Sequence, residues 1–359
     1  MASGRTSFRN KRNRFVGINW MFEILVMAAE SENAGRFWED SRVVVVGGAG
    51  FIGSHFVDSL LGSPQVTRVT VFDNFSSGKE HHLADHSRDK RLQIARGDVS
   101  DLPALRECLR GHDLVIHLAS NPDIAKAMED PSVDFWQGTY LTFNVVEAMR
   151  QAGVKRILYA SGSGVYGDQG LRETREDFGP LLPISTYGAS KLAGEGLLSC
   201  YCYMFEFRAR AFRFANVIGP RQTHGVGLDF VRRLQRDPTR LRILGDGTQS
   251  KSYIHVTDIV NAVHTAHSGG SDAFEVFNVG TGDAITVTQI AGLAIEALGL
   301  RDSTVELTYT GGNRGWKGDV PVVRLNSDRI RALGWRPKMG SRDAMARAIR
   351  ELIIGVPAE

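Results

Sequence analysis

Apolar and polar positions alternate in two rhythms along the first two thirds of the chain. Compact runs of Val, Ile, Leu and Phe predict buried strands, and apolar residues at helical spacing between them predict helices. Strands are expected at Arg42–Val46, Val69–Phe72, Leu92–Ala95, Leu114–Leu118, Ile157–Ala160 and Ala209–Phe214. Helices are expected at Phe51–Leu61 and near 101–110, 132–152 and 186–206. This order predicts an α/β fold with a Rossmann-type doubly wound parallel sheet, covered on both faces.

The pattern changes past residue 217. Glycine-rich turns become frequent, and further helices are expected near 227–236, 256–267, 286–298 and 341–354. We therefore predict three parts. These are an extension over residues 1–40, a Rossmann domain over 41–216, and a smaller mixed α/β C-terminal region over 217–359 that mainly binds substrate.

The first forty residues differ from the rest. Residues 1–26 hold five basic residues and one acidic residue, and without them the formal charge falls from +3 to −1. The charge therefore gives no reason to expect a nucleic-acid partner. The apolar stretch from Phe15 to Ala29 has the outline of a secretory signal, but Glu23 interrupts it. We expect a disordered extension or a mis-assigned start, with Met21 and Met27 as alternative starts, and a fold that needs nothing before Ser41.

The composition excludes several classes of protein and predicts the cellular compartment. Hydrophobic residues make up 42% of the 359 positions and charged residues 23%, which excludes a collagen-like or globally disordered chain. The three cysteines fit neither a zinc site nor a disulfide framework, so we expect no metal and predict a reducing, cytoplasmic setting. No apolar run reaches the roughly 18 residues of a membrane span, so no membrane partner is expected. His81, His82 and His86 lie in a polar stretch and are expected to be solvated.

A glycine turn directly follows the first strand. Gly47, Gly50 and Gly53 stand at G-x-x-G-x-x-G spacing before the first helix. The first allows a tight turn, the second lets the backbone approach a pyrophosphate, and the third lets the helix pack on the strand. Asp73 ends the second strand, where a carboxylate accepts hydrogen bonds from ribose hydroxyls and repels a 2′-phosphate. The pattern predicts NAD as the cofactor of the 41–216 domain, and Asp98 is placed to meet the adenine.

Tyr187 and Lys191 stand at i and i+4 near the start of a long helix, so they share one helix face. A tyrosine is a poor base at neutral pH because its ordinary pKa is about 10. A lysine cation and a positive nicotinamide ring nearby would favour the phenolate. The pair therefore predicts a tyrosine general base acting beside NAD.

These features together resemble a known family. The motifs are Gly47–His55, Asp73, Asp98, HLAS at 117–120, ASGSGVYG at 160–167, YGASK at 187–191, RFANVIGPR at 213–221 and GDGTQSKSYIHVTDIV at 245–260. They are similar to the extended short-chain dehydrogenase/reductases, in particular the NAD-dependent nucleotide-sugar epimerases and dehydratases, over roughly residues 41–355. PISTYGASKLAGE, THGV (223–226) and RGWKGDVP (314–321) are most similar to the compact UDP-glucose 4-epimerases.

The resemblance implies roles for individual residues. The cofactor-binding positions are Gly47, Gly50, Phe51, Ile52, Gly53, Asp73, Asn74, Ser76, Gly78, Asp98, Val99, Leu118, Ala119, Ser120, Tyr187 and Lys191. The substrate-binding positions are Asn216, His224, Val226, Lys251, Tyr253, Arg314 and Asp319. Among these, Asn216, Lys251 and Arg314 are the expected diphosphate contacts. The resemblance also implies a UDP-sugar substrate and a homodimer in which the helices near 132–152 and 186–206 pair across a twofold axis.

One departure from the family concerns the catalytic hydroxyl. The family carries a Ser or Thr three residues before the Val of VYG, and Gly162 stands there. A neighbouring serine could supply the hydroxyl, Tyr187 could act on the sugar 4-hydroxyl directly, or the site could be damaged. We expect Ser163 or Ser161 to assist.

The reactions of the family share oxidation at sugar C4, which gives a 4-keto sugar. A 4,6-dehydratase usually has an Asp-Glu pair where this chain has Ser163 and Gly164, and a uronate decarboxylase has a Glu at the latter position. A 3,5-epimerase needs a pair of bases that is not evident here. We therefore predict a 4-epimerase of the UDP-glucose/UDP-galactose type. The alternatives are an epimerase of UDP-N-acetylhexosamine or UDP-glucuronate, or a non-catalytic protein that binds NAD and a nucleotide sugar.

Overall fold

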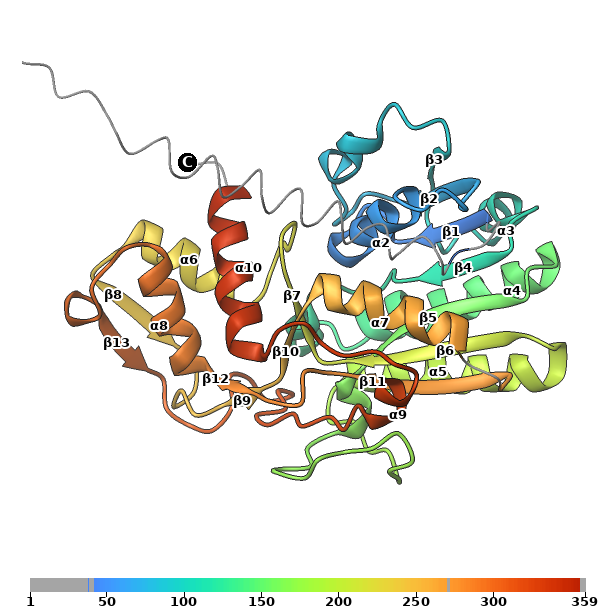
Figure 1. Ribbon diagram of the computed structural model, residues 1–359. Coiled ribbons are helices and arrows are strands. Elements are labelled where there is room, and N and C mark those ends of the chain that lie inside the picture. Colours follow the sequence, from blue (N-terminus) through green and yellow to red (C-terminus); the bar gives the residue numbers. More distant parts are fainter. Residues whose placement is uncertain (1–37, 39–41, 270–271, 356–359) are drawn as a thin grey trace, which may run out of the picture.

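The chain folds around one seven-stranded sheet (Figure 1). The computed structural model describes residue 38 and residues 42–269 and 272–355. All neighbouring strands of this sheet are parallel, in the order β11-β6-β5-β4-β1-β2-β3. The strands are β1 (Arg42–Val46), β2 (Arg68–Asp73), β3 (Leu92–Arg96), β4 (Leu114–His117), β5 (Arg156–Gly162), β6 (Arg208–Phe214) and β11 (Phe274–Val279). The strand order reverses between β1 and β4, and ligands of such sheets bind outside the carboxyl ends beside this point.

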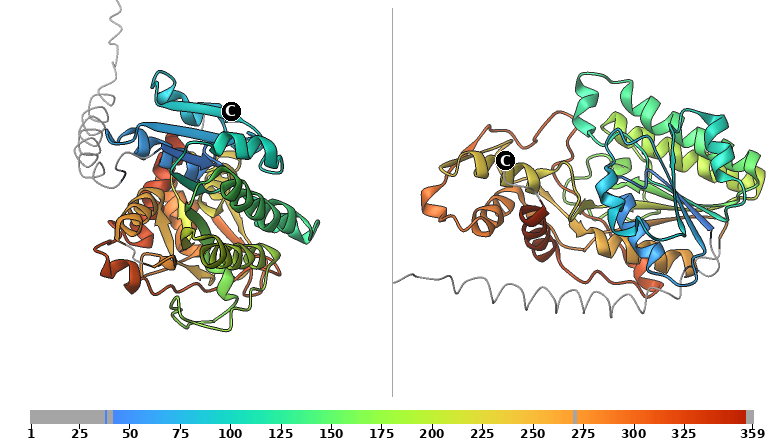
Figure 2. Two further views of the ribbon diagram at one scale, coloured as in Figure 1. Left: turned by 90° about the vertical axis from the view of Figure 1, so that its right-hand side faces the viewer. Right: turned by 90° about the horizontal axis from the view of Figure 1, so that it is seen from above.

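Helices cover both faces of the sheet (Figure 2). Those on one face are α2 (Phe51–Leu61) and α7 (Val256–Gly269), and those on the other are α3 (Leu102–Leu109), α4 (Leu141–Ala152) and α5 (Thr186–Phe205). Val43 and Val45 of β1 lie in the core shared with α2 and α7, whereas Val44 and Val46 lie in the core shared with α3, α4 and α5. Successive side chains of a strand point to opposite faces, so an unbroken apolar run is what this position requires.

A smaller region packs beside the carboxyl ends of the sheet and has its own apolar core. Its helices are α6 (Val226–Arg236), α8 (Val287–Ala297) and α10 (Ser341–Gly355). Its short strands pair as β7 (Asn216–Ile218) with β10 (Tyr253–His255), β9 (Ser250–Lys251) with β12 (Ile285–Thr286), and β8 (Arg240–Ile243) with β13 (Glu306–Tyr309). A short helix, α9 (Asp328–Ala332), returns to pack near β11 and α7.

The predicted Rossmann-type sheet with covered faces is confirmed, and the details differ in three places. The helix expected near 132–152 begins as a π-helical turn, Phe135–Tyr140, which runs into α4. The edge strand β3 is mostly half-exposed or exposed, because it pairs only with β2. Both α7 and β11 come from the region expected to bind mainly substrate, yet β11 pairs with β6 as the seventh strand.

Short 3₁₀ helices fill several of the connections. They occupy Glu80–His86, Ile124–Met128, Ser163–Tyr166 and Asp302–Thr304. The three cysteines, Cys108, Cys200 and Cys202, are free thiols. Over the part of the chain that the structure describes, no helix is both long and apolar enough to cross a bilayer. In the same residues, no three His, Cys, Asp or Glu side chains are grouped in a way that could hold a metal ion.

Trp38 corrects the expectation that the fold needs nothing before Ser41. Its side chain is fully buried in the core shared with α2 and α7. The indole N–H donates a hydrogen bond to His264, and the ring stacks on His267 with 4.9 Å between centroids. The rest of the predicted 1–40 extension lies outside the described residues, but starts at Met21 and Met27 would both retain this anchor.

Replacing Trp38 with Ala is expected to lower the free energy of unfolding by about 3 kcal/mol, since it empties a fully buried indole site. Denaturant unfolding of a chain that starts at Met27, with and without the substitution, measures this cost. The truncation alone is expected to leave stability unchanged. An equal stability of W38A and its parent would show that Trp38 is not part of the folding core.

Candidate active site

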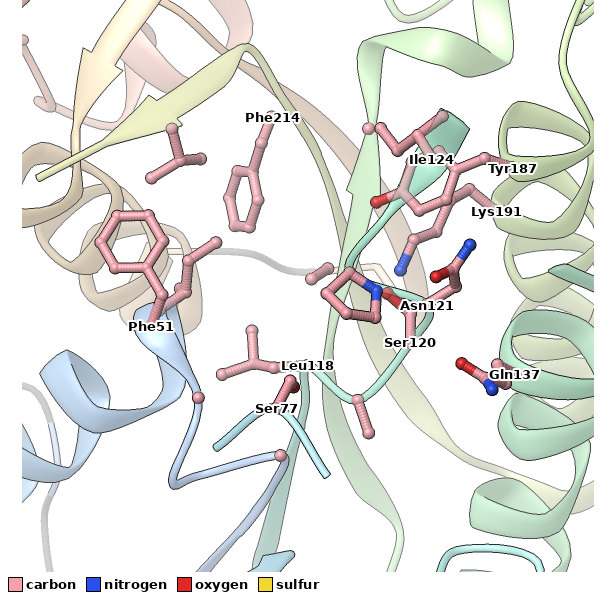
Figure 3. A pocket seen from close by; sticks show the side chains of 18 of the residues that line it. Phe51, Ser77, Leu118, Ser120, Asn121, Ile124, Gln137, Tyr187, Lys191 and Phe214 are labelled. Carbon is pink, nitrogen blue, oxygen red and sulfur yellow. The ribbon is translucent and has the colours of Figure 1, made fainter. Parts of the chain in front are cut away.

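A cavity of about 850 Å³ lies at the carboxyl ends of the central strands, between the sheet and the smaller region (Figure 3). Its wall is formed by the loops that follow β1, β2, β4 and β5, by the first turns of α5, and by the segments 214–226, 251–253 and 316–323. This volume lies toward the upper end of the range for small-molecule sites.

The glycine turn after β1 forms the floor of the cavity on the β1 side. Gly47 has a φ of +83°, which favours glycine, and a Cβ there would lie 2.8 Å from the backbone nitrogen of Ala119. A Cβ on Gly53 would lie 2.2 Å from the carbonyl oxygen of Gly47, so α2 can cross this close only with glycine. Gly50 precedes α2, and the first residues of this helix line the cavity. Free amide groups at a helix start bind phosphate, so the residues present fit the pyrophosphate of NAD.

Asp73 and Asp98 stand at the ends of β2 and β3, and both line the cavity. The Asp73 carboxylate accepts hydrogen bonds from the backbone N–H groups of Ala49 (2.9 Å) and Phe75 (2.8 Å), so it also holds the glycine turn in place. Asp98 accepts hydrogen bonds from Ser100 and from Asn74, and these contacts lower the pKa of its carboxyl group. Both acids are therefore oriented before any ligand binds.

The structure brings most of the other predicted cofactor residues to the same wall. Those lining the cavity are Phe51, Ile52, Asn74, Ser76, Val99, Leu118, Ala119 and Ser120. Gly78 does not line it, because this residue packs on Ala49, where a Cβ would lie 2.8 Å from the alanine Cβ. His82 corrects the expectation of a solvated histidine: it is buried, and its Nδ1 lies 2.8 Å from the carbonyl oxygen of Ala49. The 78–82 segment therefore packs against Ala49 and supports the glycine turn on the side away from the cavity.

Tyr187 and Lys191 project from the first turns of α5, as their spacing predicts. The hydroxyl of Ser185 accepts a hydrogen bond from the N–H of Gly188 and so caps this helix. The ammonium of Lys191 lies 5.4 Å from the centroid of the Tyr187 ring and 5.3 Å from that of Tyr159. This contact is of the cation–π type, and it places a positive charge beside the phenol.

The pKa values of this pair are set by burial. Desolvation lowers the pKa of Lys191 to about 8 and raises the pKa of Tyr187 to about 12. The charge of Asp134 adds to the rise at Tyr187, and a hydrogen bond with Ser120 opposes it. The tyrosine is therefore a protonated phenol at neutral pH in this structure, which differs from the lowered pKa predicted from the sequence because burial outweighs the neighbouring charge.

The segment after β5 contains the two candidate serines. The hydroxyl of Ser161 is buried and donates a 2.6 Å hydrogen bond to Glu195. Glu195 in turn forms a buried ion pair with Arg213 at 2.8 Å. Both serines line the cavity, but the Ser161 hydroxyl is committed to this pair, whereas Ser163 stands at the start of the 163–166 turn. Gly162 lies between them, and a Cβ there would be 4.0 Å from Cε1 of Tyr187.

The far side of the cavity carries the predicted substrate residues. Asn216, His224, Val226, Lys251, Tyr253 and Asp319 line it. Arg314 does not: its guanidinium pairs with Asp168 and donates to the carbonyl oxygen of Asp319. The ammonium of Lys251 pairs with Asp319, and both side chains are mostly buried. Lys251 is thus the cation that lines this part of the cavity, and its carboxylate partner holds it there.

Several cavity residues had no signal in the sequence motifs. They are Asn121, Pro122, Gln137, Tyr140 and Gln222. Asp134, next to the π-helical turn, was also missed and is almost fully buried. It accepts hydrogen bonds from Asn121 (2.9 Å) and Thr186 (2.7 Å), and so joins the loop after β4 to the start of α5. An isolated π-helical turn often marks a functional site, but its position cannot be read from residue spacing.

Replacing Lys191 with Met is expected to raise the free energy of unfolding at pH 7 by about 3 kcal/mol, following the pKa of about 8. Below that pKa the fold must hold a charged ammonium in a desolvated site, and this cost is fully present at pH 7. The cost fades as the pH approaches 10.5, where the unfolded chain also loses the proton. Urea unfolding at pH 7 and pH 10 measures the difference.

The exposed Lys126→Met variant is the control, and it is expected to change stability little at either pH. A K191M protein no more stable than the parent at pH 7 would show that the Lys191 ammonium is not desolvated.

Comparison with known proteins agrees with this geometry. Residues 43–280 match the NAD dependent epimerase/dehydratase family. The chain is 31% identical over 316 residues to a UDP-glucose 4-epimerase of Mycolicibacterium smegmatis, covering 86% of this chain and 97% of the relative. A solved UDP-galactose 4-epimerase is 38% identical, with a TM-score of 0.77 over 87% of this chain and 99% of its own. A dTDP-glucose 4,6-dehydratase from Streptomyces venezuelae, solved with NAD bound, is 30% identical, with a TM-score of 0.80 over 87% and 97%.

The match covers more than half of the chain, and the cavity carries the glycine turn, the ribose acids and the Tyr-Lys pair. The chain therefore belongs to the NAD-dependent epimerase/dehydratase family, a family of enzymes, and its cofactor is NAD.

Proposed function

We propose that this protein is a nucleotide-sugar 4-epimerase that interconverts UDP-glucose and UDP-galactose. The observation that carries the proposal is the position of the carboxylates in the cavity. Within the described wall, the acidic residues are Asp73, Asp98 and Asp319. The first two stand at the ends of β2 and β3, and Asp319 is paired with Lys251. None of them belongs to the β5 segment or to α5, which carry Gly162, Ser163 and Tyr187.

This arrangement separates two reactions of the family. Elimination across C5 and C6 of a 4-keto sugar needs a general acid and a general base beside the sugar ring. A 4-epimerisation needs only the proton transfer at the 4-hydroxyl and a sugar that can present either face. Gly162 and Gly164 line the cavity without side chains, which leaves room beside Tyr187 for the sugar to turn. The wall therefore favours epimerisation over dehydration.

Tyr187 is the group that accepts the proton of the sugar 4-hydroxyl and later returns it. Lys191, with a pKa of about 8, carries its charge at neutral pH. Its ammonium lies 5.4 Å from the centroid of the Tyr187 ring, so the charge stabilises the phenolate. When bound, NAD supplies the two-electron oxidant for the sugar carbon and is regenerated at the end of each turnover. On the far side, Lys251 can exchange Asp319 for a phosphate oxygen of the nucleotide, which anchors the substrate while the sugar is free to move.

The test is incubation of the NAD-loaded protein with a panel of UDP-hexoses, with products followed by NMR. Interconversion of UDP-glucose and UDP-galactose is the expected result. Replacing Tyr187 with Phe is expected to lower the turnover number by about 10²–10⁴-fold while NAD stays bound, because only the proton acceptor is removed. Tyr309→Phe removes a phenol in the smaller region, outside the cavity, and is the matched control.

The outcomes are distinct. Conversion of another UDP-sugar would keep the reaction and change the substrate, with UDP-N-acetylhexosamine and UDP-glucuronate as the alternatives. Loss of water would replace epimerisation by dehydration. No product from any UDP-sugar, with NAD bound and with Y187F indistinguishable from the parent, would contradict the proposal and favour a binding role.

The proposal includes a homodimer built on α4 and α5. These helices carry exposed apolar side chains, which are costly to leave in water: Trp136 and Phe143 near α4, and Tyr203 and Met204 on α5. Tyr203 is 92% exposed. Two copies related by a twofold axis would cover these side chains with the same surface of the partner.

Light scattering during gel filtration is expected to give twice the 39.5 kDa chain mass. Replacing Tyr203 and Met204 together with Glu is expected to give the monomer, because the two copies together would bury four carboxylates where they meet. A monomeric parent protein, or a dimer that survives the double replacement, would contradict this surface.

A further inference from the structure

The hydroxyl that would normally stand beside the catalytic tyrosine is missing from the β5 segment. A Cβ on Gly162 would have Cε1 of Tyr187 as its nearest neighbour, at 4.0 Å, so a hydroxyl-bearing side chain would fit there. Ser161 cannot substitute for it, because its hydroxyl donates to the buried Glu195. That leaves Ser163 and Ser120, which both line the cavity, as candidates for the second hydroxyl.

Ser120 is a hydroxyl on the opposite side of the same space. It follows β4 in the loop 118–122, and this loop lines the cavity. Figure 3 shows Ser120 close to the Tyr187 and Lys191 side chains that come from α5. The two elements are held together by Asp134, which accepts hydrogen bonds from Asn121 and from Thr186, the neighbours of Ser120 and Tyr187. Ser120 is thus fixed next to the phenol by contacts on both elements.

The Ser120 hydroxyl affects the protonation state of Tyr187. Burial and the charge of Asp134 both raise the pKa of Tyr187, and the nearby Ser120 hydroxyl lowers it. A hydroxyl can donate its proton to a phenolate and accept one from a neighbouring donor. Hydrogen bonds to a charged oxygen are roughly twice as strong as neutral ones, so the contact gains strength when Tyr187 loses its proton.

We propose that Ser120, rather than a residue of the 161–164 segment, is the second catalytic hydroxyl: it donates a hydrogen bond to the Tyr187 oxygen in the deprotonated state. No bond is broken in this step, and the Ser120 proton stays on serine while the phenolate takes the substrate proton. The inference deepens the proposed epimerase, because the phenolate it stabilises is the proton acceptor of that reaction.

The first test needs no sugar. Tyrosinate absorbance of the NAD-loaded protein is titrated against pH, and the titration of Y187F is subtracted to isolate Tyr187. Replacing Ser120 with Ala is expected to move the Tyr187 midpoint upward by about one pH unit, as expected for loss of a charge-assisted hydrogen bond. Ser120→Thr keeps the hydroxyl and is expected to keep the midpoint.

The second test uses turnover. S120A is expected to lower kcat at pH 7 by about tenfold, with a smaller change in KM, and to shift the rising limb of the pH profile upward. Adding Gly162→Ser to S120A places a hydroxyl on the other side of Tyr187 and is expected to restore part of the loss. This rescue would not follow if Ser120 only supported the loop.

An S120A protein with an unchanged Tyr187 midpoint overturns the inference, as does a midpoint shift produced by Ser163→Ala and not by S120A. The proposed function fails separately. If S120A shifts the midpoint and no UDP-sugar is converted by the parent protein, Ser120 remains the partner of Tyr187 and the epimerase assignment falls.

Discussion

The position of α5 depends on one buried ion pair. Glu195 lies one helical turn beyond Lys191, and its carboxylate accepts hydrogen bonds from Arg213 of β6 and Ser161 of β5. Arg213 also donates to the hydroxyl of Tyr166, which donates to Asn278 of β11. A buried ion pair is costly unless its hydrogen-bonding groups are satisfied, and here both oxygens of Glu195 have partners. The pair fixes α5 against three strands, so the positions of Tyr187 and Lys191 on this helix depend on it.

Much of the fold could be read from the sequence because its signals are local. β1 has consecutive valines, as a strand covered on both faces requires. The glycines that follow indicate the tight turn, because a Cβ on Gly47 or Gly53 would clash with the backbone. The Tyr-Lys spacing places both groups on one face of α5 wherever that helix lies. The exposure of the edge strand β3 and the π-helical turn before α4 were harder to predict, because they depend on neighbouring elements more than on their own residues.

The site was predicted less completely, and the failures have one cause. Whether a side chain faces the cavity depends on partners that are distant in the sequence. Arg314 has the charge to hold a phosphate but pairs with Asp168, which is 146 positions away. Ser161 and Ser163 look equivalent in ASGSG, and only the position of Glu195 distinguishes them. Trp38 lies before the first strand, and nothing near it indicates that α7 provides two histidine rings for it.

The path of the chain between its two regions has a consequence for how such enzymes diversify. After β6 the chain enters the smaller region, returns to the sheet as α7 and β11, leaves again, and touches the sheet once more at α9 before ending in α10. The smaller region is therefore not a module that recombination could exchange as one piece. Changes to the far wall of the cavity must arise by separate substitutions in segments such as 214–226, 251–253 and 316–323, while the returning elements keep the sheet intact.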